Sequence, residues 1–342
     1  MDSKSTHHDK KHRYVITLAG GGGKRLWPLS RTDQPKQLLP LYGSVTLLEK
    51  TIERMQVFAP RERQYLVTIE AYVHDIQRLI ADRIGTIIPE PVGRNTAPAI
   101  ALSCLEIIKH DSEAVVIIVP ADHVIHDEEK FATALELACG YAHAYDKLVL
   151  LGVKPDRAAT EYGYIETLAS ATHKVLPVIR FHEKPTAHVA DWYYHNENML
   201  WNSGIICAKA SVLLDEITLH APEIIAGIGQ YETLQPSSID YAVLEKSERV
   251  AVVSADFGWS DVGSLSSFMA AYADKNQPTK SINVLAAADN RSIAKKPVVF
   301  AGVTNVCIIE TDDLIFVVDT QQMHRSAEIA EYLAAQGFRE YT

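Results

Sequence analysis

The sequence has few cysteines, no long apolar run and no excess of positive charge, and each shortage excludes a class of protein. Its four cysteines, Cys104, Cys139, Cys207 and Cys307, lie far apart and form no Cys-x-x-Cys pair. A zinc site or disulfide framework is therefore not expected, and a reducing cytoplasm is the simplest location. No apolar run approaches the roughly 20 residues that span a bilayer, so no membrane partner is expected. Residues 1–13 are rich in Lys, His and Asp and lack the apolar segment of a secretory signal, which predicts a disordered tail.

Acidic residues outnumber basic ones along the whole chain. Asp and Glu number 43 against 33 Lys and Arg, which gives a formal net charge of −10 at pH 7. A chain with this balance does not hold nucleic acid or anionic lipid by bulk charge. The net charge does not exclude the binding of a small anionic ligand in a local basic pocket. The 342 residues correspond to about two domains and allow a core without disulfides.

Short β-branched runs alternate with helical patterns in the first half. Residues 115–119 are five consecutive β-branched residues, which is typical of a strand buried on both faces. The expected strands of this half are 14–18, 64–69, 86–88, 115–119 and 148–153, and the expected helices are 45–55, 73–83, 96–109 and 131–145. This rhythm predicts an α/β fold with a doubly wound, mostly parallel sheet. Short β runs and a last helical pattern follow Lys280, so we expect a main domain over 14–275 and a small β-rich C-terminal domain with a terminal helix over 281–342.

Four consecutive glycines, residues 20–23, follow the first predicted strand and precede Lys24 and Arg25. Without Cβ atoms they let the backbone approach a ligand and point N–H groups at anionic oxygens. The loop is not a Walker A motif, which needs Ser or Thr after the lysine, nor the dinucleotide fingerprint, whose last glycine is missing. A merely flexible turn is the alternative. Arg25, Arg31 and Lys36 place three cations within twelve residues, which fits an anion pocket and a solvated basic loop equally well.

The segment 20–31, followed by Pro-Lys-Gln at 35–37, is similar to the signature of the sugar-1-phosphate nucleotidyltransferases. Within that family it most resembles the short mannose-1-phosphate guanylyltransferases, which lack an isomerase domain. Further matching motifs follow in the family's order at 89–99, 120–123, 162–166, 183–185, 201–204, 238–242 and 259–263. Each motif is short, but their common order is very specific. The chain departs from the pattern at Lys24, where Thr is usual, and the stretch after Lys280 is only loosely similar.

The resemblance implies transfer of GMP from GTP to a hexose 1-phosphate, with α-D-mannose 1-phosphate as the expected partner and GDP-mannose and pyrophosphate as products. This reaction joins two anions, and a phosphate monoester is already a nucleophile, so no general base is required. The protein must offset repulsion, align the attack and stabilise the leaving pyrophosphate, which calls for backbone N–H groups, Lys, Arg and a divalent ion. The expected catalytic residues are Arg25, Lys36, Asp122, Lys184 and Asp261.

Two aspartates are the expected ligands of Mg²⁺. Asp122 follows the buried run 115–119, and in open α/β sheets the carboxyl ends of the strands face the ligand crevice. One or two carboxylates plus substrate phosphates is the usual way to hold this ion, and the resemblance implies Asp261 as the second. Taken singly, each could be a loop or cap residue. The expected nucleotide-binding residues are Gly20, Gly21, Gly23, Lys24, Glu90, Asn95 and Thr96. The expected sugar-phosphate-binding residues are Gly163, Glu183, Lys184 and Asn202.

Several alternatives stay open. The same chemistry could serve another hexose 1-phosphate or another base, because loop geometry decides which hydroxyls are recognised. A catalytically silent sugar-nucleotide sensor is a second alternative, although a sensor would be free to lose the charged residues that are retained here. A nucleic-acid-binding module is opposed by the net charge and the lack of a basic stripe. Pairing of two chains through the C-terminal β-rich stretch, as in a homodimer, is also left open.

Overall fold

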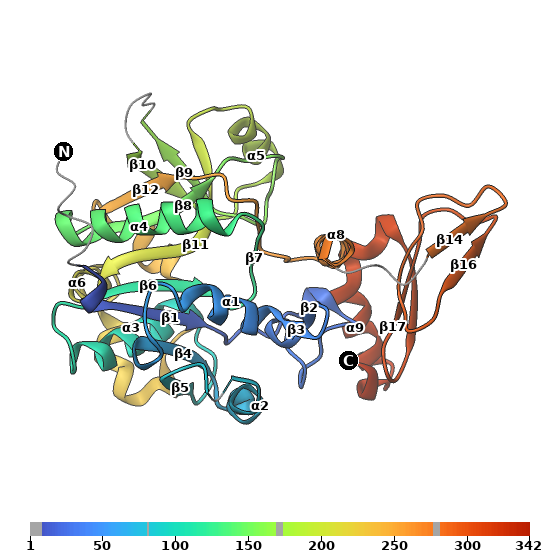
Figure 1. Ribbon diagram of the computed structural model, residues 1–342, viewed down its shortest axis with the longest axis horizontal. Helices are drawn as coiled ribbons and strands as arrows, with labels where there is room; N and C mark the ends of the chain where they lie inside the picture. Colours follow the sequence, from blue (N-terminus) through green and yellow to red (C-terminus); the bar gives the residue numbers. More distant parts are fainter. Residues whose placement is uncertain (1–8, 81, 169–173, 276–280) are drawn as a thin grey trace. The chain divides into compact units, whose positions relative to one another are not determined.

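The computed structural model describes residues 9–80, 82–168, 174–275 and 281–342 (Figure 1). Residues 1–8 of the expected tail therefore lie outside the described residues. The described residues form two compact units, each assembled from separate stretches of chain. The first unit contains the residues up to Gly20 together with Ile52–Ala121 and Ile125–Trp259, and the second contains Gly21–Thr51, Asp122–Val124 and Ser260–Thr342.

The first unit is built on a nine-stranded sheet with the order β5-β4-β1-β6-β11-β8-β12-β10-β9. Its strands are β1 (Arg13–Leu18), β4 (Gln64–Ile69), β5 (Thr86–Glu90), β6 (Val115–Pro120), β8 (Leu148–Val153), β9 (Tyr164–Thr167), β10 (Val175–His182), β11 (Met199–Lys209) and β12 (Val250–Ser254). Strands β10 and β11 run opposite to the others, so the sheet is mostly parallel, as expected. Strand β11 is inserted between β6 and β8, which places an antiparallel strand in the middle of the sheet.

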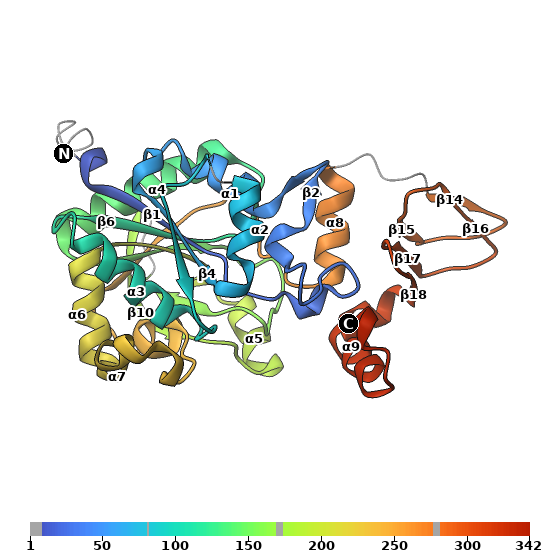
Figure 2. The ribbon, with the colours of Figure 1, turned by 90° about the horizontal axis from the view of Figure 1, so that it is seen from below.

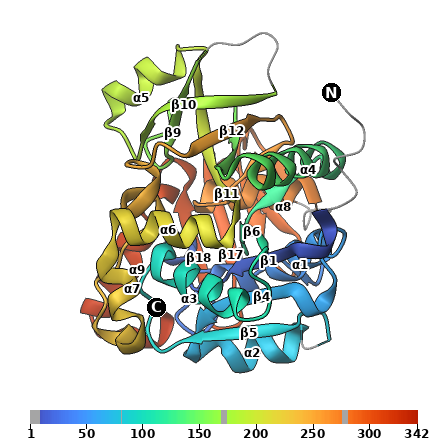
Figure 3. The same cartoon turned by 90° about the vertical axis from the view of Figure 1, so that its left-hand side faces the viewer.

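Helices cover both faces of this sheet (Figure 3). Helices α3 (Thr96–Ile108), α6 (Ala210–His220) and α7 (Pro222–Gly227) pack on one face, and α4 (Glu128–Tyr145) packs on the other. Val116 and Ile118 of β6 point into the apolar core on the side of α3, α6 and α7, whereas Val115 and Ile117 point into the core on the side of α4. Burial on both faces explains the unbroken β-branched run, and the prediction of a doubly wound α/β fold is confirmed.

The first unit contains further helices and turns. They are α2 (Glu70–Ile80), α5 (Ala187–Tyr194) and the 3-10 turns η4 (Arg61–Arg63) and η5 (Ile228–Thr233), together with η6 (Asp240–Leu244), a π-helical turn. Helix α1 (Leu47–Met55) and the short strands β7 (Val124–Ile125) and β13 (Trp259–Ser260) lie where the chain passes from one unit to the other. Within the described residues, no helix is both long and apolar enough to cross a bilayer. The four cysteines are buried free thiols.

The chain is folded before the end of the expected tail. Asp9–His12 forms a 3-10 turn (η1), and Arg13 is the first residue of β1. The Arg13 side chain is only 1% exposed, and two of its nitrogens each lie 2.8 Å from a carboxylate oxygen of Glu136 in α4. His12 Nδ1 lies 2.9 Å from a carboxylate oxygen of Asp111. The pairing with Glu136 allows the Arg13 guanidinium to be buried. Residues 9–13 therefore belong to the folded chain, and the expectation of disorder is wrong for them.

The second unit joins the segment after the glycines to the C-terminal part of the chain. Strands β2 (Pro40–Tyr42) and β3 (Val45–Thr46) pair, and α8 (Leu265–Lys275) packs against β2 (Figure 2). The C-terminal elements are β14 (Ser281–Val284), β15 (Arg291–Ile293), β16 (Val298–Ala301), β17 (Val306–Glu310), β18 (Ile315–Asp319), the turn η7 (Thr320–Arg325), α9 (Ser326–Ala335) and the turn η8 (Arg339–Tyr341). The stretch after residue 280 is therefore β-rich and contains a late helix, as expected.

Candidate active site

The glycine-rich loop follows β1 and turns at Gly23 into the short 3-10 turn η2 (Lys24–Leu26). Gly23 has a φ of 68°, in the left-handed region that favours glycine. A Cβ at this position would lie 2.4 Å from the Cβ of Lys36 and 3.0 Å from its backbone nitrogen. At Gly21, in contrast, a Cβ would meet no atom within 4 Å. The turn therefore needs glycine at residue 23 because Lys36 approaches it closely, and Gly21 presents open backbone.

Lys36 connects Asp122 and Asp261, the two expected metal ligands. It opens the 3-10 turn η3 (Lys36–Leu38), and its side chain is only 8% exposed. Its Nζ lies 2.8 Å from Oδ2 of Asp122 and also donates a hydrogen bond to the backbone carbonyl of Asp261. Three residues from distant parts of the sequence thus meet in the second unit around one ammonium group.

The positive charge of Lys36 helps to lower the pKa of Asp122. Burial alone would raise the pKa of the Asp122 carboxyl, but the nearby positive charges of Lys36 and His123 hold that pKa below its ordinary value. Asp122 is therefore an ionised carboxylate at neutral pH, as a metal ligand must be. Its side chain is 29% exposed, so it is also accessible.

Asp261 is held by the backbone that follows it. Its Oδ1 accepts a hydrogen bond of 2.9 Å from the backbone nitrogen of Gly263. A Cβ at Gly263 would lie 2.3 Å from Oδ2 of Asp261, so the aspartate requires glycine at this position. Val262 between them has a φ of 47°, which is uncommon for a β-branched residue and marks a strained turn.

The donor set fits a small divalent cation better than zinc. Among the described residues there is no group of three or more His, Cys, Asp or Glu side chains that could enclose a metal. Asp122 and Asp261 carry hard carboxylate oxygens, and Lys36 contacts the carboxylate of Asp122 and the backbone carbonyl of Asp261. A site of one or two carboxylates, completed by phosphates of the substrate, is the arrangement that Mg²⁺ favours.

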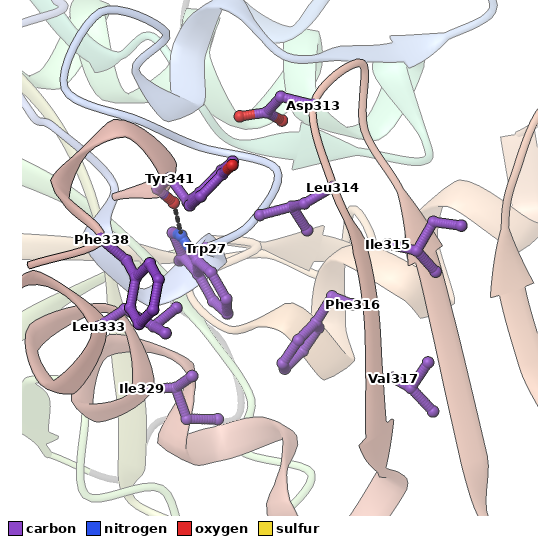
Figure 4. Close-up of a pocket in the computed structure, with 10 residues that line it drawn as sticks. All are labelled: Trp27, Asp313, Leu314, Ile315, Phe316, Val317, Ile329, Leu333, Phe338 and Tyr341. Carbon is purple, nitrogen blue, oxygen red and sulfur yellow. Dashed lines mark hydrogen bonds between the residues drawn. The ribbon is translucent and has the colours of Figure 1, made fainter. Parts of the chain in front are cut away.

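The C-terminal part of the second unit braces the turn that carries Arg25. Ser326, the first residue of α9, is buried and donates a 2.7 Å hydrogen bond to the Arg25 carbonyl. The indole nitrogen of Trp27 donates a 2.7 Å hydrogen bond to the Tyr341 carbonyl (Figure 4). Trp27 also packs edge-on against Phe316, at a ring-centroid distance of 4.9 Å, and forms one wall of an apolar groove. Lys24 and Arg25 themselves remain exposed.

The other candidate nucleotide-binding residues lie in the first unit. Glu90 ends β5 and is only 3% exposed. A Cβ at Gly20 would lie 3.1 Å from its Oε2, so the first glycine of the loop lies against this carboxylate. Asn95 caps α3, with its side-chain oxygen accepting a 2.8 Å hydrogen bond from the backbone nitrogen of Thr96. The Thr96 hydroxyl accepts a 2.8 Å hydrogen bond from the backbone nitrogen of Ile239.

The candidate sugar-phosphate residues form a second group in the same unit. Gly163 is packed rather than open, because a Cβ there would lie 2.6 Å from Oε2 of Glu183. The backbone nitrogen of Asn202 donates a 2.8 Å hydrogen bond to the Gly163 carbonyl. Lys184 donates a hydrogen bond to the Glu183 carboxylate, which is itself buried. Burial alone would lower the pKa of Lys184, but this bond and the charges of Glu183 and Asp240 raise it, so the ammonium persists.

Asp240 completes this second group and was not among the expected site residues. It begins the turn η6, and its Oδ1 accepts a 3.0 Å hydrogen bond from the side-chain nitrogen of Asn202. Burial and the negative charge of Glu183 raise the pKa of Asp240 to about 6. The sequence did contain a signal for Asp240, because the residue lies in 238–242, one of the motifs that match the family. Two carboxylates and one ammonium form a polar cluster suited to several hydroxyl groups beside one phosphate.

Tyr231 is the second residue that sequence reasoning missed. Its hydroxyl donates a hydrogen bond to Oε1 of Glu90, and it is only 6% exposed. It lies in the turn η5, outside every matched motif, so no local pattern distinguishes it from a core aromatic residue. Segment 228–245 thus contacts both groups of the first unit, through Tyr231 at one end and Asp240 at the other.

The chain is similar to proteins of known class over most of its length. The model of the family described as nucleotidyl transferase matches residues 14–277. A mannose-1-phosphate guanylyltransferase of Escherichia coli K12 is 32% identical over 96% of this chain and 75% of its own length. One of Salmonella muenchen is 34% identical over 95% of this chain and 74% of its own. This chain thus spans about three quarters of the length of these relatives.

A solved structure shows the same similarity in three dimensions. The crystal structure described as that of mannose-1-phosphate geranyltransferase from Thermus thermophilus superposes with a TM-score of 0.84 at 31% identity. The match covers 94% of this chain and 99% of that one. It therefore includes the β-rich C-terminal part as well as the α/β sheet.

Proposed function

This chain belongs to the nucleotidyl transferase family, and from that premise we propose that it transfers GMP from GTP to α-D-mannose 1-phosphate. The products are GDP-mannose and pyrophosphate. Relatives named for this activity match nearly the whole chain. The structural observation that carries the proposal is the meeting of Asp122 and Asp261 at the Lys36 ammonium, because it brings together the two aspartates that a divalent cation between phosphate-bearing substrates would need.

In the proposed reaction, a phosphate oxygen of the sugar phosphate attacks the α-phosphorus of GTP while the bond to the leaving pyrophosphate breaks. Backbone N–H groups of the glycine loop and the cations Lys24 and Arg25 bind the phosphates and stabilise the leaving charge. The bracing of the Arg25 turn by Ser326 keeps these donors in place before the substrate arrives. No side chain has to remove a proton from the nucleophile.

Asp122 and Asp261 would hold the divalent cation, which we propose to be Mg²⁺. When bound, the cation offsets the negative charge of the phosphates. Lys36 keeps Asp122 ionised and fixes the Asp261 backbone, so that the two carboxylates are arranged before the substrates bind. The four buried free thiols are consistent with a reducing compartment, and we propose a cytoplasmic location.

The group around Glu90 binds the guanine base in this proposal, and the group around Lys184 binds the sugar phosphate. Glu90 offers two acceptors to the N1–H and 2-amino donors on the edge of guanine. The Asn95 cap and the Thr96 hydroxyl fix the start of α3 beside it. Lys184 binds the phosphate of the sugar, while Glu183 and Asn202 bind ring hydroxyls.

A pyrophosphate-release assay tests the proposed function. The purified chain is mixed with Mg²⁺ and each pair from a grid of nucleoside triphosphates and hexose 1-phosphates. We expect the highest kcat/KM for GTP with mannose 1-phosphate. A different best pair would assign the same chemistry to another substrate, whereas binding without turnover for every pair would make the chain a sugar-nucleotide sensor.

Removing the charge of Lys184 is expected to weaken the sugar phosphate selectively. Lys184→Met keeps the apolar stem but deletes a charge-assisted bond, which contributes about 1.5–3 kcal/mol. Steady-state kinetics should show KM for mannose 1-phosphate raised about tenfold or more and KM for GTP raised less than about threefold, where chemistry is slower than substrate release. The matched control is Lys154→Met, at an exposed lysine of the same unit. Equal increases in both KM values would contradict the assignment of Lys184 to the sugar phosphate.

A further inference from the structure

Glu90, which the proposed function assigns to the base, forms a buried polar pair with Tyr231, a residue that has no role in the proposed reaction. The carboxylate is 3% exposed and the tyrosine 6%, and the phenolic O–H donates to Oε1. The opposite oxygen, Oε2, lies on the side of Gly20, where the glycine loop begins. A carboxylate has about four acceptor positions, so the bonds from Tyr231 and from the Arg94 backbone leave about two for a ligand.

The direction of this hydrogen bond is fixed. Burial and the neighbouring Glu90 charge raise the pKa of Tyr231 far above its ordinary value, so the phenol keeps its proton and acts as the donor. Burial likewise raises the pKa of Glu90, while the bonds from Tyr231 and from the Arg94 backbone oppose that rise. The tyrosine therefore favours the ionised carboxylate in a place that otherwise disfavours charge.

Other bonds hold the segment that carries Tyr231 against the loop that carries Glu90. The Arg94 guanidinium donates to the Glu232 carbonyl, and the Arg94 carbonyl accepts a 3.0 Å hydrogen bond from the Ser237 nitrogen. The Ser237 carbonyl in turn accepts a 3.0 Å hydrogen bond from Ala97. Because these bonds do not involve the phenol, losing the Tyr231 hydroxyl leaves the segment in place.

We propose that Tyr231 is a positioning residue for base recognition, holding the Glu90 carboxylate so that its remaining acceptors face the N1–H and 2-amino donors of guanine. This rests on the proposed function, which assigns the base to Glu90. Guanine requires two adjacent acceptors in one plane, and a carboxylate free to rotate, or protonated, would not present them. The hydroxyl thus acts on specificity through Glu90 and does not itself contact the base.

The test compares GTP with ITP, which lacks only the 2-amino group. Equilibrium affinity and kcat/KM are measured for both triphosphates, with Mg²⁺ present, on the wild type, Tyr231→Phe and Glu90→Ala. We expect the wild type to prefer GTP about tenfold or more, as one charge-assisted bond implies. In Tyr231→Phe the preference should fall to within about threefold, close to Glu90→Ala. Tyr65→Phe, which removes another buried phenol of the same unit, should keep the wild-type preference.

A pH series separates positioning from packing. The Tyr231 bond lowers the pKa of Glu90, so its loss raises that pKa further, and on acidification the variant takes up a proton at a higher pH than the wild type. Any GTP preference that remains in Tyr231→Phe should therefore disappear at a higher pH than in the wild type. An unchanged preference and pH profile would overturn the inference while leaving the transfer reaction standing. A wild type that prefers GTP through Tyr231 but shows no turnover would support the inference and overturn the proposed function.

Discussion

Replacing either Asp122 or Asp261 by asparagine is expected to lower kcat at least about 100-fold, because each change removes a carboxylate charge from the proposed metal site. The two variants should differ in stability. Asp122→Asn also breaks the 2.8 Å ion pair with Lys36 and leaves that buried ammonium with less compensation. Asp261→Asn keeps an oxygen that can accept the bond from Gly263, so its thermal unfolding should be close to that of the wild type.

A matched control is available in the same unit. Asp319 also accepts a hydrogen bond from the backbone nitrogen two residues later, at 2.8 Å from Gln321. Asp319→Asn therefore makes the same chemical change at a carboxylate that accepts a bond from the second backbone nitrogen after it, and it should leave kcat within about twofold of the wild type. Steady-state kinetics over a range of Mg²⁺ concentrations, with melting curves, measure both properties. Normal kcat in Asp261→Asn at ordinary Mg²⁺ would show that this carboxylate is only structural.

Much of the α/β sheet could be predicted because its signals are local. The run at 115–119 is β-branched throughout, and it forms β6 between two apolar cores. The predicted strands 64–69 and 148–153 coincide with β4 and β8. A strand buried on both faces has no alternation of polar and apolar residues, so an unbroken apolar run in the sequence is enough to predict it.

The position of β11 could not be derived in this way. The strand comes from the second half of the chain and lies between β6 and β8, antiparallel to both. Which strands become neighbours depends on packing between distant segments, and periodicity within one segment carries no information about it. The ordered start at Arg13 was missed for a similar reason, since its partner Glu136 lies in α4.

In the candidate site too, local motifs predicted which residues take part but not which of them are in contact. The motifs supplied Asp122, Asp261 and Lys36, but not the fact that one ammonium joins them. Asp240 lay inside a quoted motif without an assigned role, whereas Tyr231 lay outside all of them. A buried tyrosine is most often a core residue, and only the position of its hydroxyl beside Glu90 gives it another role.

Replacing Gly23 by alanine is expected to lower kcat about 100-fold, although the residue carries no functional group. The new Cβ would lie 2.4 Å from the Cβ of Lys36, about 1 Å inside ordinary van der Waals contact. The turn η3 must then move by a similar distance, and the Lys36 ammonium loses its place between Asp122 and Asp261. A misplacement of about 1 Å in a catalytic arrangement can reduce the rate about 100-fold.

Gly43 separates this displacement from the cost of the left-handed backbone, because it has the same φ of 68° and a Cβ there would meet no atom within 4 Å. Both alanine variants should lose about 1–2 kcal/mol of unfolding free energy for the left-handed conformation, and only Gly23→Ala should also lose activity. Denaturant unfolding and kcat on the two proteins give the comparison. If Gly23→Ala and Gly43→Ala kept equal activity, the close approach of Lys36 to the loop would not matter for catalysis. The glycine would then be retained for its backbone conformation alone.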